Sequence, residues 1–145
     1  MDGKTQGLDF VDESALIQAI ADVRNDNKPD AEWCIAEFDQ SDPKVPKLCL
    51  KQVGSGDIDT MKASFAPDNF NFAFFRLTEV IDKTVAVRFC FIKSQPEATP
   101  FRVKGKLGQK IGAVTAVFSP VHGDLVIDTP DELTAEDVVA ITKKK

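Results

Sequence analysis

Two stretches near the middle of the chain decide the fold: residues 70–77 read FNFAFFRL, and residues 84–92 read TVAVRFCFI. Successive side chains of a β-strand point to opposite faces, and in both stretches both faces are apolar. Strands of this kind are typical of the centre of a sheet that is covered on both sides. The connection from Thr78 to Lys83 is short enough for a hairpin, so we predict that the two strands are neighbours.

On either side of this pair, hydrophobic periodicity predicts further strands and helices. Strands are predicted at residues 31–39, 47–53 and 124–128. Helices are predicted at residues 13–24, 57–65, 101–118 and 130–141. Helices that alternate with strands apolar on both faces imply three layers, in which the sheet lies between two layers of helices.

Two of the predicted helices begin with capping signals. Asp12 is expected to cap the helix over 13–24. Thr129 is expected to cap the last helix, with Pro130 at its first position and Glu132 completing a capping box. The apolar face of the first helix is expected to consist of Leu16, Ile17, Ile20 and Val23.

The length of 145 residues is close to the roughly 150 expected of one domain, and 43% of the residues are apolar. That is enough for a core without a disulfide or metal staple. No apolar run approaches the roughly 20 residues that span a bilayer, and no apolar signal segment follows Met1, so we expect a cytoplasmic protein with no membrane contact. We predict a flexible N-terminal arm over residues 1–10, a single domain over 11–142 and a basic C-terminal tail over 143–145.

The residues that usually bind metals are few and far apart. The chain has Cys34, Cys49 and Cys90, each within an apolar run, and a single histidine, His122. No CxxC pair occurs, so we predict no metal site and expect the cysteines to be buried as small apolar side chains. His122 is expected in a turn beside Gly123. Nothing in the pattern calls for a cofactor.

Motifs for catalysis and for phosphate binding are missing from the sequence. There is no GxxxxGK[ST] loop, and no pair of carboxylates is placed for general acid–base work, so an enzyme is not expected. The run from Gly105 to Gly108 matches the GxxG clamp of KH-type RNA-binding proteins. That clamp joins two helices, whereas these glycines fall within one helical pattern. A small nucleic-acid or anionic-ligand binding module that uses this loop remains the alternative function.

Charge is unevenly distributed along the chain. The formal net charge is −5, yet residues 83–110 carry seven cations against Glu97 alone, a net +6, so that the remainder carries −11. This basic segment is either a solvated helix face or a docking surface for an acidic partner. On a helix over 101–118, the side chains of Arg102, Lys106, Gln109 and Lys110 would share an arc of about 100°, opposite the apolar stripe.

Arg88 is an unusual residue for its strand. The face of the strand on which it lies otherwise holds Thr84, Ala86, Cys90 and Ile92. Its side chain therefore either snorkels at the edge of the layer or points at a partner.

Taken together, the elements and their order resemble the actin-depolymerising-factor homology (ADF-H) family, most closely its coactosin-like branch. The resemblance spans about residues 11–142. It is carried by Val23-Arg24-Asn25-Asp26, Trp33, Asn71-Phe72-Ala73-Phe74-Phe75-Arg76-Leu77, Val87-Arg88-Phe89-Cys90-Phe91-Ile92, Arg102-Val103-Lys104, Leu125-Val126-Ile127-Asp128 and Glu132-Leu133.

The resemblance implies an α+β fold of the gelsolin-like kind, with a central mixed β-sheet between helices on both faces. It implies a monomeric actin-binding protein of the cytoplasm and actin cytoskeleton that prefers filaments to monomers, without enzymatic activity or nucleic-acid binding. The site residues that it implies are Lys83, Arg88, Arg102, Lys104, Lys106, Gln109 and Lys110.

Some features depart from the family pattern, among them the hairpin and the long helix. Val85 and Ala86 stand where the hairpin of the family is usually more basic, and glycines at 105, 108 and 112 weaken the predicted long helix, since each costs roughly 0.8–1 kcal/mol relative to Ala. Of the contacts that the resemblance implies, Arg88 matches the position of a basic residue that coactosin-like proteins use for filament binding.

Overall fold

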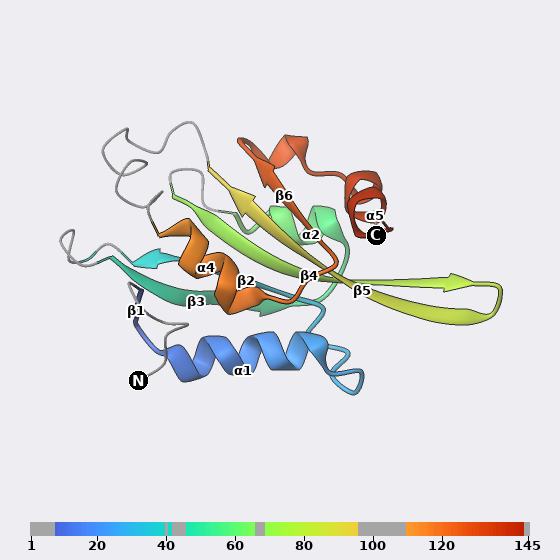
Figure 1. Cartoon of the computed structure of the whole chain (residues 1–145), viewed down its shortest axis with the longest axis horizontal. Coiled ribbons are helices and arrows are strands. Elements are labelled where there is room, and N and C mark those ends of the chain that lie inside the picture. Colours follow the sequence, from blue (N-terminus) through green and yellow to red (C-terminus); the bar gives the residue numbers. More distant parts are fainter. Residues whose placement is uncertain (1–7, 40, 42–45, 66–68, 96–109, 144–145) are drawn as a thin grey trace.

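The structure is a computed structural model that describes residues 8–39, 41, 46–65, 69–95 and 110–143. Its centre is a six-stranded sheet in the order β1-β3-β2-β4-β5-β6 (Figure 1). The strands are β1 (Asp9–Phe10), β2 (Trp33–Asp39), β3 (Lys47–Gly54), β4 (Asn71–Ile81), β5 (Thr84–Ser94) and β6 (Gly123–Ile127). The two outer pairs, β1 with β3 and β5 with β6, are parallel, and the inner pairs are antiparallel, so the sheet is mixed as expected.

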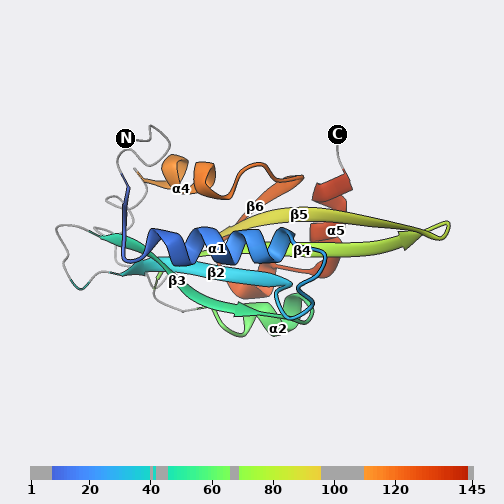
Figure 2. The ribbon, with the colours of Figure 1, turned by 90° about the horizontal axis from the view of Figure 1, so that it is seen from below.

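Helices cover both faces of the sheet, which confirms the predicted three layers. One face carries α1 (Glu13–Arg24) and α4 (Ile111–Phe118), and the other carries α2 (Ile58–Lys62) and α5 (Ala135–Lys143). Figure 2 shows α4 and α2 on opposite sides of the strands. A short 3₁₀ helix, η2 (Pro130–Glu132), joins β6 to α5.

Two buried clusters hold the layers together, one on each face of the sheet. In β2, the side chains of Cys34 and Ala36 belong to the cluster under α1 and α4, whereas Trp33 and Ile35 belong to the cluster under α2 and α5. This alternation follows from the period of two along a strand. Gly54 of β3 has no side chain because the indole of Trp33 occupies that space: a Cβ there would lie 2.5 Å from a ring carbon.

The first helix begins as the sequence predicts but buries a narrower face. The Asp12 side chain accepts a hydrogen bond from the Ala15 backbone N–H at 3.2 Å, which is the expected cap. Leu16, Ile20 and Val23 are buried, but Ile17, which was expected on the same face, is 44% exposed. Ile17 lies about 100° around the helix from Leu16, at the exposed margin of the apolar stripe.

The capping prediction for the last helix was also wrong. Thr129 makes no side-chain cap, and Pro130–Glu132 form the separate 3₁₀ turn η2. The Glu132 carboxylate does reach back, accepting a hydrogen bond from the Asp128 N–H at 3.2 Å. α5 begins five residues later than predicted, where Thr134 Oγ1 accepts a hydrogen bond from the Asp137 N–H at 3.1 Å.

Two further expectations concern segments at the limits of the described chain. The last two residues of the expected N-terminal arm, Asp9 and Phe10, form β1 against Lys47 and Leu48 of β3. Of the helix predicted over 101–118, the described part is α4, with Lys110 as its N-cap residue. Residues 101–109 of that prediction lie outside the described residues.

Candidate functional site

The structure describes only some of the residues that were predicted to bind a partner. Arg102, Lys104, Lys106 and Gln109 lie outside the described residues. The other three, Lys83, Arg88 and Lys110, are described and do not form one cluster. Lys110 begins α4 at the end of the sheet opposite the projecting hairpin, whereas Lys83 is at the tip of that hairpin and Arg88 is at its base (Figure 1).

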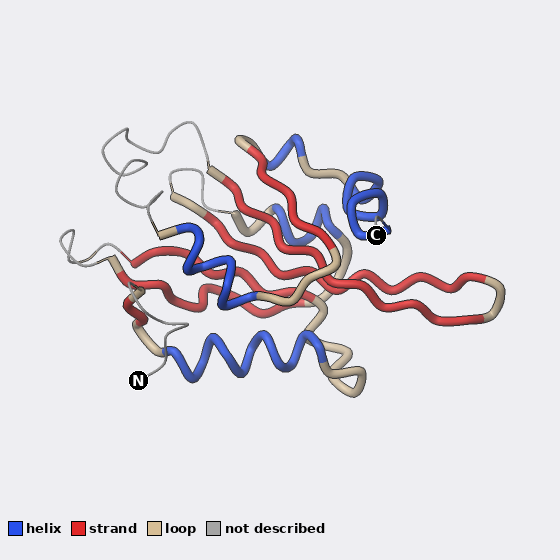
Figure 3. The backbone as a smooth tube through the Cα atoms, in the orientation of Figure 1, coloured by secondary structure: helices blue, strands red, loops and turns tan. Residues whose placement is uncertain are grey.

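The β4–β5 hairpin is longer than predicted and extends beyond the rest of the sheet (Figure 3). Its two strands pair without interruption from Asn71↔Ser94 to Ile81↔Thr84. β2 pairs with β4 only as far as Phe75, and β6 pairs with β5 only from Cys90 onward. Residues 76–81 and 84–89 therefore form a two-stranded ribbon, which we call the distal hairpin.

The distal hairpin closes in a two-residue turn made by Asp82 and Lys83. Both have positive φ, 51° and 66°. Two left-handed residues define the type I′ turn, whose twist matches that of the flanking strands, although Asn and Gly are its usual residues. The Lys83 side chain is exposed at this tip.

Apolar side chains are exposed close to the turn. Val80 and Val85 are cross-strand partners, 70% and 62% exposed, and Ile81 beside them is also exposed. Large exposed apolar groups that gather on a projecting element are typical of interaction sites. We call Val80, Ile81, Lys83 and Val85 the hairpin tip.

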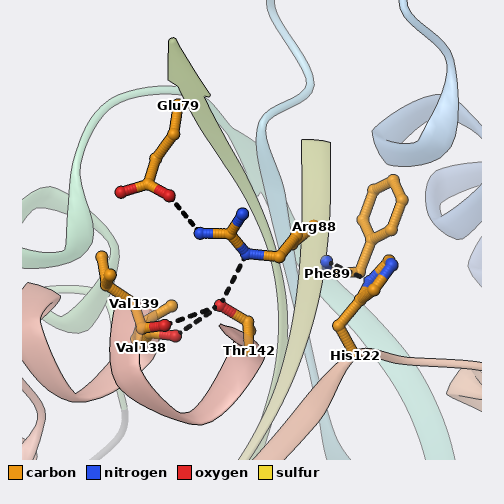
Figure 4. Close-up of polar contacts among 7 residues, drawn as sticks. All are labelled: Glu79, Arg88, Phe89, His122, Val138, Val139 and Thr142. Carbon is orange, nitrogen blue, oxygen red and sulfur yellow. Dashed lines mark hydrogen bonds and ion pairs between the residues drawn. The ribbon is translucent and has the colours of Figure 1, made fainter. Parts of the chain in front are cut away.

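Arg88 lies at the base of the distal hairpin, and its guanidinium is held by internal partners (Figure 4). One nitrogen forms an ion pair with the Glu79 carboxylate, and Nε donates to Thr142 Oγ1 of α5 at 3.2 Å. The Thr142 hydroxyl in turn donates to the Val138 carbonyl at 2.7 Å. The Arg88 side chain is 14% exposed, so it reaches the edge of the layer but does not display its charge.

The electrostatics of this group link the hairpin to α5. The hydrogen bond from Arg88 holds the pKa of Glu79 below its usual range and outweighs the opposing effect of desolvation. The charges of Arg88 and of Lys143 in α5 add smaller effects in the same direction as the hydrogen bond. Gly123 at the start of β6 allows α5 to pack closely, since a Cβ there would lie 2.7 Å from the Ile141 carbonyl oxygen.

On the opposite face, Arg24 and Arg76 join α1 to the sheet and to α4. The Arg24 guanidinium stacks over the ring of Phe74 at 4.7 Å and donates to the carbonyls of Phe118 and Pro120 at 2.9 and 2.8 Å. Arg76 donates to the Val23 carbonyl at 2.9 Å and pairs with Asp26. Sequence reasoning found no role for these arginines, although both stand in stretches that carry the family resemblance.

The cysteines and the histidine have structural roles. Cys34 and Cys90 are buried as predicted, and burial raises the pKa of both thiols to about 12, whereas Cys49 is half-buried. His122 Nδ1 accepts a hydrogen bond from the Phe89 N–H at 2.9 Å (Figure 4). Within the described ranges, no three His, Cys, Asp or Glu side chains are grouped to hold a metal ion.

A shallow cavity of about 330 Å³ lies between α2 and the start of α5. The Lys62 ammonium group, which lines this cavity, donates a hydrogen bond to the Leu133 carbonyl at 2.9 Å and forms an ion pair with Asp59 at 3.5 Å.

In the part of the chain that the structure describes, no helix is long and apolar enough to cross a membrane.

The chain matches a known class of protein. The cofilin/tropomyosin-type actin-binding protein family matches residues 10–142, nearly the whole chain, and the chain belongs to this family. Coactosin from Entamoeba histolytica is 25% identical over 134 residues, covering 92% of this chain and 88% of the relative. The coactosin-like branch expected from the sequence is thereby confirmed.

Solved structures agree with this assignment at the level of the fold. The crystal structure of E. histolytica coactosin has a TM-score of 0.81 at 22% identity, covering 94% of this chain and 95% of that chain. Human coactosin-like protein has a TM-score of 0.77 at 21% identity, covering 94% and 99%. Mouse coactosin, described as an actin filament binding protein, has a TM-score of 0.69 at 21% identity, covering 91% and 88%.

Proposed function

We propose that this chain binds the side of actin filaments in the cytoplasm, as a monomer, and modulates filament dynamics without catalysing a reaction. Membership of an actin-binding family and the filament binding named for mouse coactosin support the proposal. The observation that carries it is the projecting hairpin, because its tip exposes Val80 and Val85 beside Lys83, away from the body of the sheet.

The proposed contact combines two parts of the chain. The hairpin tip supplies apolar area and one cation. Of the predicted residues of the basic segment, Arg102, Lys104, Lys106 and Lys110 supply charge toward an acidic partner, and Gln109 supplies a neutral hydrogen-bonding side chain. Preference for filaments over monomers is part of the proposal. The family and its relatives give no support to the nucleic-acid alternative based on the run from Gly105 to Gly108.

Cosedimentation with filaments tests the proposal. Wild-type protein should pellet with filaments, and Val80→Ser/Val85→Ser should weaken binding by on the order of tenfold, because two central apolar contacts are lost. Binding should also weaken as salt rises, since part of the contact is electrostatic. A monomeric-actin binding assay, run in parallel, should show weaker binding than the filament assay.

Val126→Ser is the matched control. Val126 is 58% exposed, like Val85, but lies on β6, outside the hairpin. The control should bind like wild type. Wild type that stays in the supernatant at low salt would refute filament binding, and a hairpin double variant that binds like the control would refute the role of the tip.

A further inference from the structure

We infer that Arg88 is a positioning residue, which fixes the distal hairpin relative to α5 through Glu79 and Thr142 and does not offer its own charge to the partner. This inference rests on the proposed filament binding, and it reassigns a residue that the sequence places among the direct contacts. We call Glu79, Arg88 and Thr142 the hairpin clamp.

The clamp stands where the distal hairpin leaves the sheet. Arg88 is paired with Leu77, two positions before β6 joins β5 at Cys90. Glu79 is paired with Ala86, so Glu79 and Arg88 are diagonal neighbours on one face of the ribbon. α5 packs against that same face, and its Thr142 is the third member (Figure 4).

A brace at this point is needed because the distal hairpin lacks further strands. A two-stranded hairpin alone is marginally stable, and two-stranded ribbons twist more than sheets. Any rotation at the base is carried to the tip, where Val80 and Val85 are exposed. Arg88 restrains this rotation from two directions, because one nitrogen is held by the neighbouring strand and another by a helix of the body.

A direct contact with a partner conflicts with these bonds. To reach an acidic partner, the guanidinium would leave Glu79 and Thr142, and the carboxylate of Glu79 would lose the cation that pairs with it. The pair is partly buried, with Arg88 14% and Glu79 26% exposed, so breaking it leaves a carboxylate that is only partly compensated by solvent. The exposed cation of the hairpin is Lys83, at the tip.

The two roles predict opposite results for Glu79→Gln in filament cosedimentation. If Arg88 positions the hairpin, Glu79→Gln and Arg88→Met should each weaken binding by about five- to tenfold, and Thr142→Val should weaken it in the same direction. The swap Glu79→Arg/Arg88→Glu should bind more tightly than Arg88→Met, because it restores a pair. If Arg88 contacts actin directly, Glu79→Gln should bind as well as wild type or better, and the swap should not rescue.

A second readout does not depend on actin. In the free protein, ¹⁵N relaxation should show that Glu79→Gln increases the mobility of the amides of residues 78–87 but leaves those around Phe91 unchanged. Asp30→Asn, which removes one carboxylate charge from an exposed turn, is the control and should alter neither binding nor mobility.

The outcomes separate the inference from the proposed function. Wild type that does not pellet refutes filament binding itself. Wild type that pellets, together with Glu79→Gln that binds as tightly and leaves the distal hairpin rigid, refutes the clamp alone. Thermal unfolding of each variant shows whether the body has remained folded, and a folded variant with a mobile hairpin and weak binding supports the inference.

Discussion

The same two strands, β4 and β5, behave differently along their length. In the body of the sheet, residues 71–75 and 90–94 lie between β2 and β6, and Phe72, Phe74 and Phe91 are completely buried. In the distal hairpin the strand pairing continues in register, but Val80 and Val85 are exposed. The two strands therefore remain paired beyond the point where their side chains are buried. Whether a side chain belongs to the core depends on whether neighbouring strands and helices cover it.

The largest expected difference between the two regions is in stability. Phe91 is fully buried, with its ring 4.8 Å from that of Phe118, so Phe91→Ala should lower the free energy of unfolding by about 3–5 kcal/mol. Val85→Ala should change it by no more than about 0.5 kcal/mol, because the side chain is already exposed. Urea unfolding monitored for both variants checks this. Similar losses in the two variants would show that the distal hairpin is part of the core.

Thiol reactivity should show the same contrast. Burial raises the pKa of Cys90 to about 12, so at pH 8 its thiolate fraction is at least about 1000-fold lower than that of an ordinary thiol. In Val85→Cys, the new thiol in the distal hairpin should react with iodoacetamide at an ordinary rate while Cys90 and Cys34 remain unmodified. Peptide mass spectrometry distinguishes the sites, and labelling in urea should modify all of them. Rapid native labelling of Cys90 would contradict its place in the core.

The smallest expected effect concerns the hairpin turn. Lys83 has a φ of 66°, which an L side chain adopts at a cost, so Lys83→Gly should stabilise the turn by about 0.5–1 kcal/mol. Hydrogen exchange of amides in the distal hairpin should slow by about two- to fivefold, whereas exchange in the body should not change. Thr84→Gly, in the first extended residue of β5, is the control and should accelerate exchange in the hairpin. If both variants accelerate it, the left-handed turn is not a source of strain.

The body of the fold could be predicted from sequence because its signals are local and strong. The doubly apolar runs at 70–77 and 84–92 predicted the central strand pair, and Asp12 predicted the start of α1. The prediction for Ile17 was wrong because hydrophobic periodicity gives the direction of the buried helix face and not its width. The prediction that Thr129 caps the last helix was wrong because two threonines precede that helix. The sequence does not show which of them is the cap, and in the structure it is Thr134.

The candidate site was less predictable because its contacts are not local. Arg88 could be recognised as unusual from the apolar residues around it, but its partners are 9 and 54 residues away in the sequence. The hairpin register relates Arg88 to Glu79 only once β4 and β5 are aligned, and Thr142 requires the docking of α5. Neither follows from a spacing rule. The exposure of Val80 and Val85 likewise depends on where β2 and β6 stop.

The burial of Trp33 gives the protein a built-in optical reporter. The chain has one tryptophan and no tyrosine, so the intrinsic emission of the folded molecule comes from this single indole, packed against Gly54 in the cluster beneath α2 and α5. Because the ring lies in the body and not in the distal hairpin, its fluorescence follows unfolding of the sheet without responding directly to swinging of the hairpin. A single measurement of tryptophan fluorescence can therefore show that the body of the sheet is folded in a hairpin variant before any actin is added.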